Sequence, residues 1–80
     1  MIDFQAKLVD LTAREAEVLC AIIAGYSTVA IAFWFGISPK TVSVHRAHIY
    51  KKLGVKGISN LTRLAIASGV QPLRSVHGRR

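Results

Sequence analysis

The residues with the clearest chemistry are basic and small side chains that alternate between residues 38 and 56. They recur at spacings of three and four and would share one helix face: Lys40, Ser43, Val44, Ala47 and Lys51. Such a face is cationic at both ends and carries only short side chains in the middle. Ammonium groups bind phosphate, and short side chains allow close approach to base edges in a DNA groove. The face therefore predicts a DNA-binding helix, although a solvated face of an ordinary amphipathic helix has the same composition.

A helix over residues 39–53 is expected to carry this face. Ser38 can cap it, and Pro39 fits its first position because the missing N–H would be unpaired there. Gly54 follows as a left-handed stop. The opposite stripe should pack inward: Val42, His45, Ile49 and Leu53.

Two shorter helices are expected before this one, over about residues 13–24 and 28–35. Thr12 and Glu15 form a capping box for the first, and Ser27 caps the second. A short helix, a tight glycine-containing turn and a longer basic helix make a helix-turn-helix pattern.

A fourth helix is expected over about residues 58–68, with Ser59 or Asn60 as its cap. One stripe would face the core: Leu61, Leu64, Ala65 and Ser68. A second apolar side favours a partner helix, most simply from a second copy in a two-fold dimer: Ile58, Thr62 and Ile66. Partial exposure of Ile66 would explain the same pattern. The fold class is thus all-α, a four-helix bundle containing a helix-turn-helix.

The composition indicates one small domain that binds a negatively charged partner. The chain has 80 residues, a hydrophobic fraction of 51% and a net charge of +7, and its four acids all precede residue 18. This layout favours nucleic acid or an anionic membrane surface. The single Cys20 excludes an internal disulfide and is expected to be a buried, inert thiol in a reducing compartment. We expect a cytoplasmic protein, associated with the nucleoid when bound to DNA.

The helical periodicity divides the chain into three expected segments: a lead-in over residues 1–10 with weak helical potential, the domain over 11–70, and a basic, disordered tail over 71–80. Residues 18–36 carry no charge and are long enough to span a bilayer. A break at Gly25 followed by the Ser27 cap favours two short helices instead, and no membrane partner.

The pattern resembles the LuxR-type (GerE-type) helix-turn-helix domain over about residues 11–70. The matching positions are Leu11-Thr12, Arg14-Glu15, Glu17-Val18-Leu19, Gly25, Ser27, Ile31-Ala32, Ile37-Ser38, Lys40-Thr41-Val42, His45-Arg46, Ile49 and Lys52-Leu53-Gly54-Val55. The resemblance implies a four-helix bacterial DNA-binding transcription regulator. It also implies a third helix that enters the major groove and a fourth that mediates dimerisation.

The resemblance also implies roles for single positions. Base contacts would fall on Ser43, Val44 and Ala47. Phosphate contacts would fall on Lys40, Thr41, Arg46, Lys51 and Lys52, with Ser27 or Thr28 at the start of the second helix. The family often carries long polar side chains where this chain has Ser43 and Ala47. We therefore expect phosphate to supply much of the affinity, with modest base discrimination.

The second helix departs from the family by its apolar outer face, formed by Val29, Phe33 and Trp34. An exposed apolar patch often marks an interface, so a regulatory protein partner is a candidate. Alternatively, lead-in residues cover the patch: Ile2, Phe4 and Leu8.

Two other functions remain open at this stage: a protein-binding adaptor that uses the apolar patch, and a membrane-associated basic peptide. No enzyme, cofactor or metal site is expected. His45 and His48 lie three residues apart, but no carboxylate or thiol accompanies them in their helix, and His45 lies on the inward stripe.

Overall fold

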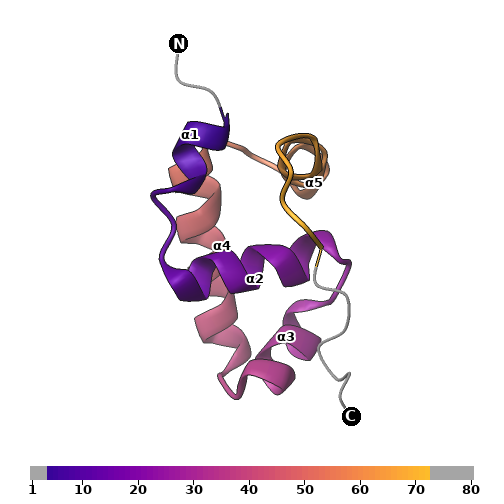
Figure 1. The fold of residues 1–80 in the computed structure, drawn as a ribbon. Helices are drawn as coiled ribbons and strands as arrows, with labels where there is room; N and C mark the ends of the chain where they lie inside the picture. Colours follow the sequence, from indigo (N-terminus) through magenta and orange to yellow (C-terminus); the bar gives the residue numbers. More distant parts are fainter. Residues whose placement is uncertain (1–3, 73–80) are drawn as a thin grey trace.

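The computed structural model describes residues 4–72, which form five helices and no strand (Figure 1). The helices are α1 (Phe4–Leu8), α2 (Ala13–Ile23), α3 (Thr28–Phe35), α4 (Pro39–Leu53) and α5 (Ile58–Ala67). The long helix α4 runs the length of the domain, and α2 crosses it (Figure 1). The prediction of an all-α fold with a helix-turn-helix, here α3 and α4, is confirmed for the described residues.

Local side-chain caps begin three of these helices, as the sequence predicts. The Thr12 hydroxyl accepts a hydrogen bond from Glu15 N at 3.1 Å, and Glu15 Oε1 accepts one from Thr12 N at 3.0 Å. Ser27 Oγ accepts from Ala30 N at 3.1 Å, and Ser38 Oγ accepts from Thr41 N at 3.0 Å. These bonds satisfy N–H groups that have no partner inside the helix, and they fix where α2, α3 and α4 start.

The predicted cap of α5 is wrong. The helix begins at Ile58 behind Gly57, whose backbone is extended and offers no side-chain cap. Ser59 and Asn60 therefore lie inside the first turn, and Asn60 Oδ1 instead accepts from Arg63 Nη2 at 2.8 Å.

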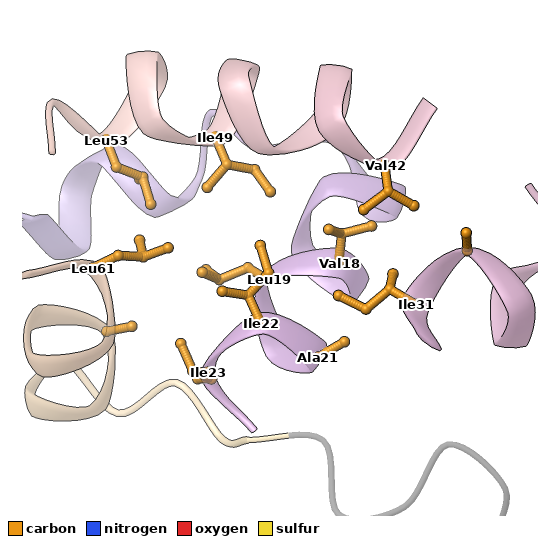
Figure 2. Packing of buried hydrophobic residues seen from close by; sticks show 12 residues of the cluster. Val18, Leu19, Ala21, Ile22, Ile23, Ile31, Val42, Ile49, Leu53 and Leu61 are labelled. Carbon is orange, nitrogen blue, oxygen red and sulfur yellow. The ribbon is translucent and has the colours of Figure 1, made fainter. Parts of the chain in front are cut away.

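The core lies between α4 and the helices that cross it (Figure 2). From α4 come Val42, Ile49 and Leu53; from the other helices come Val18, Leu19, Ile22, Ile31, Leu61 and Ala65, all buried. The predicted inward stripe of α4 is confirmed at three of its four positions. The fourth, His45, is half-buried, and its Nδ1 is buried with no hydrogen-bond partner among the described residues.

The lead-in is more ordered than the sequence suggests, because part of it forms α1. This helix contacts α4 and α5, and Leu8 packs against the core. Figure 1 shows α1 and α3 at opposite ends of the molecule. The interpretation that Leu8 covers the apolar face of the second helix is therefore wrong, while Ile2 and the Phe4 side chain lie outside the described residues. So does most of the predicted tail, from residue 73 on.

The uncharged stretch over residues 18–36 is divided between two helices. Helix α2 ends at Ile23, and α3 begins at Thr28 after a turn in which Gly25 has a φ of +96°. In the described part of the chain, no helix combines the length and apolar character needed to cross a membrane.

Candidate nucleic-acid interface

The outward face of α4 gathers the side chains that the sequence selects for DNA contact. All five are exposed: Lys40, Ser43, Val44, Ala47 and Lys51. The opposite face packs chiefly against α2 and α3. Because the buried face fixes the helix to the core, the exposed face is presented on a rigid support. The arrangement suits a polyanion, with a cation at each end and only short side chains between them.

The N-terminal end of α4 adds hydroxyl groups to this face. Ser38 Oγ and Thr41 Oγ1 are 2.9 Å apart, and both residues are exposed. At the start of α3, Ser27 is exposed and Thr28 is half-buried. Helix N-termini carry a partial positive charge and favour phosphate, so both starts are suitable for backbone contacts.

Arg46 lies on one flank of α4, where Tyr50 holds its guanidinium. Arg46 Nη2 donates to the Tyr50 hydroxyl at 3.1 Å, and the guanidinium carbon lies 5.7 Å from the Tyr50 ring centroid. An arginine has five N–H donors, so donors remain for a phosphate.

Lys52 lies on the other flank, and its ammonium is already engaged inside the domain. Its Nζ is 2.8 Å from Glu15 Oε1 and 3.2 Å from the carbonyl oxygen of Asp10. Only 34% of its side chain is exposed. The adjacent Lys51 is exposed, and its side chain has no hydrogen bond or ion pair within residues 4–72. The sequence predicts a phosphate contact for both lysines, whereas in the structure their side chains have different surroundings.

Glu15 is the buried charged residue among residues 6–72, with 4% of its surface exposed. The hydrogen bond from Lys52 and that from the Thr12 backbone hold the pKa of Glu15 below its usual value, although burial acts in the opposite direction. His48 Nδ1 lies 3.6 Å from Glu15 Oε2 and forms an ion pair when protonated. Together His48, Lys51 and Lys52 line a hollow on the surface of α4.

Sequence reasoning missed part of this cluster. It assigned Glu15 to the capping box, and for His48 it weighed a metal site against packing and phosphate contact, but not an ion pair. The spacing of His48 and Lys52, four residues apart, was a signal that they share a flank of α4. Their partner lies 37 residues away from Lys52 in the chain, so no local pattern reveals it. Within residues 4–72, no group of three or more His, Cys, Asp or Glu side chains could hold a metal ion.

Two apolar surfaces lie away from this face. On α3, Val29 is 67% exposed, Phe33 73% and Trp34 41%. The two aromatic rings meet edge to face, with centroids 5.1 Å apart. On α5, Ile58 and Ile66 are exposed, and Thr62 is half-buried.

Comparisons with known proteins give one family model and several related proteins. The profile of GerE, described as bacterial regulatory proteins of the LuxR family, matches residues 9–65. The transcriptional regulatory protein FixJ of Rhizobium meliloti is 43% identical over 70 residues, covering 88% of this chain and 34% of FixJ. TdiR of Thauera aromatica is 46% identical over 54 residues, covering 68% of this chain and 24% of TdiR.

UhpA of Escherichia coli, also a transcriptional regulatory protein, is 45% identical over 53 residues, which are 66% of this chain and 27% of UhpA. The chain thus spans about a third or less of the length of these curated relatives. The comparison with solved structures gives no match.

Proposed function

This chain belongs to the LuxR family of bacterial regulatory proteins, which are DNA-binding regulators of transcription, and we propose that its helix α4 reads the major groove of double-stranded DNA. The observation that carries this proposal is the exposed face of α4, with lysines at both ends and small side chains between them. A helix fits the major groove of B-DNA, and the buried opposite face of α4 fixes its orientation.

The contacts divide by chemistry. Ser43, Val44 and Ala47 face the base edges, where Val44 and Ala47 meet thymine methyl groups and Ser43 supplies one hydroxyl. Phosphate is bound around them by Lys40, Thr41, Arg46 and Lys51, with Ser27 and Thr28 at the start of α3. Phosphate contacts carry most of the affinity, because the base-facing side chains are short.

The protein acts as a homodimer in the cytoplasm and at the nucleoid. Ile58, Thr62 and Ile66 lie on one side of α5, and the two isoleucines are exposed there. Pairing this side with that of a second copy would bury both isoleucines and place two α4 helices on a two-fold-symmetric site.

The test is selection of bound duplexes from a random library at moderate salt. We expect recovery of a two-fold-symmetric sequence with a fixed half-site spacing. Retention of duplexes without an enriched motif would mean that phosphate contacts dominate binding and that α4 makes no specific base contacts. No retention at all would overturn the proposal.

A second candidate function is favoured by the exposed apolar face of α3. Val29, Phe33 and Trp34 form an exposed patch on α3, which lies at the opposite end of the molecule from α1 (Figure 1). Exposed apolar patches mark protein interfaces. In this function the domain is an adaptor that binds a regulatory protein. The fluorescence of Trp34 would then shift when that protein is added and stay constant when DNA is added.

A further inference from the structure

The buried Glu15 distinguishes two adjacent lysines of α4 that the sequence cannot distinguish. We propose that Glu15 holds Lys52 inside the domain and thereby leaves Lys51 as the lysine that binds DNA phosphate at this end of α4. The inference rests on the proposed function, since it assigns the phosphate contacts of the same face.

The geometry of α4 separates the two ammonium groups. Successive residues on a helix point about 100° apart, so Lys51 faces outward when Lys52 points along the flank. Lys52 Nζ reaches Glu15 Oε1 at 2.8 Å and the Asp10 carbonyl oxygen at 3.2 Å. Both acceptors come from the segment where α2 begins. Lys52 therefore joins α4 to that segment.

Glu15 cannot follow Lys52 outward toward a phosphate. Its carboxylate is fixed by the N–H of Thr12 at 3.0 Å, and its backbone N–H is bonded to the Thr12 hydroxyl. The residue is almost fully buried. Moving Lys52 to a phosphate would leave a buried carboxylate without its main partner, and such a charge is strongly unfavourable. A single exposed phosphate contact does not compensate for that loss.

Glu15 consequently limits the affinity of the domain for DNA of any sequence. It neutralises Lys52, and it also faces His48 at 3.6 Å. Without the carboxylate, Lys52 is free to reach a phosphate, which adds binding without adding base contacts. Glu15 is thus a positioning residue that keeps this flank of α4 from strengthening non-specific binding.

The test is the salt dependence of binding to a duplex of arbitrary sequence. Each phosphate contact contributes about 0.9 to the slope of log affinity against log salt concentration. Lys51→Met should make the slope shallower by about 0.9, and Glu15→Gln should make it steeper by about 0.9. The double variant Glu15→Gln/Lys52→Met should keep the wild-type slope. It also keeps the wild-type net charge and leaves no buried charge unpaired.

Glu17→Gln is the matched control. It removes the same charge from the same helix at a side chain that is 62% exposed and paired with Arg14. We expect the wild-type slope for this variant. An equal steepening in Glu15→Gln and Glu17→Gln would mean that only overall charge matters, and it would overturn the proposal.

The remaining outcomes separate this proposal from the proposed function. If the double variant loses as much slope as Lys51→Met, Lys52 binds phosphate in the wild type and the proposal is wrong. If the wild type binds no duplex at any salt concentration, the proposed function fails first. Circular dichroism of each variant establishes that it is folded. If the variants that carry Glu15→Gln do not fold, Lys51→Met alone still decides, because an unaltered slope in that variant would overturn the proposal.

Discussion

The inward and outward faces of α4 are built from different residue types and have different tasks. Inward, Val42, Ile49 and Leu53 are buried in the core, and the flank at Lys52 is joined to Glu15. Outward, the side chains are short or cationic and exposed. One face therefore fixes where the helix lies, while the other is available for contact. Changes to the two faces should therefore affect different measurements.

The largest effect is expected from shortening a buried side chain on the inward face. Ile49→Ala removes methyl groups from a fully buried site and should lower the free energy of unfolding by about 2–5 kcal/mol. Val44→Ala, on the outward face of the same helix, should change it by less than about 0.5 kcal/mol. Denaturant titration of both variants measures this. Equal losses would contradict the division of α4 into a packing face and a contact face.

The next effect concerns the ionic link between α2 and the flank of α4, and it depends on pH. The pKa of Glu15 is lower in the folded domain than in the unfolded chain, chiefly because of the bond from Lys52. The link therefore contributes stability above the unfolded pKa of the carboxyl group, and the contribution is lost as pH falls toward the folded pKa. At pH 7, Glu15→Gln should lower the free energy of unfolding by roughly 1–3 kcal/mol.

The difference between wild type and Glu15→Gln should then shrink steadily as the pH is lowered below the ordinary range of a glutamate. Thermal unfolding across a pH series gives this directly, with Glu17→Gln as the exposed control. A difference that stays constant with pH would show that the Glu15 charge does not support α4.

A smaller effect is expected at the N-terminus of α4, which both faces share. Ser38→Ala removes the hydroxyl that caps the helix and should lower the free energy of unfolding by about 1 kcal/mol. The same change at Ser27, which caps α3, is the matched comparison. If Ser38→Ala weakens DNA binding more than Ser27→Ala at equal loss of stability, the start of α4 also contacts DNA.

The smallest effect on stability, and a distinct effect on binding, is expected from the outward lysine at the start of α4. Lys40→Met should change the free energy of unfolding by less than about 0.5 kcal/mol. It should reduce the slope of log affinity against log salt concentration by about 0.9, equally for all duplex sequences. A change in sequence preference with an unaltered slope would instead make Lys40 a base-contacting residue.

The local part of this fold was readable from the sequence. Caps connect residues that are three positions apart, as at Thr12 and Glu15 or Ser38 and Thr41, so the bounds of α4 and the starts of α2 and α3 follow from residue types. The inward stripe of α4 was readable for the same reason, because helical periodicity relates nearby residues. The start of α5 near residue 58 was also predicted, but its cap was not, since an extended glycine precedes the helix and offers no side chain.

Residue types and their spacing were enough to predict four helices, a helix-turn-helix and a basic outward face on the second helix of that motif. Packing of the helices sets where α1 lies, at the opposite end of the molecule from α3 (Figure 1). It also sets which of Lys51 and Lys52 is engaged internally. The physical reason is distance along the chain. An ion pair between Glu15 and Lys52 exists only once α2 and α4 are packed together, and the spacing of residues along one helix carries no information about that packing.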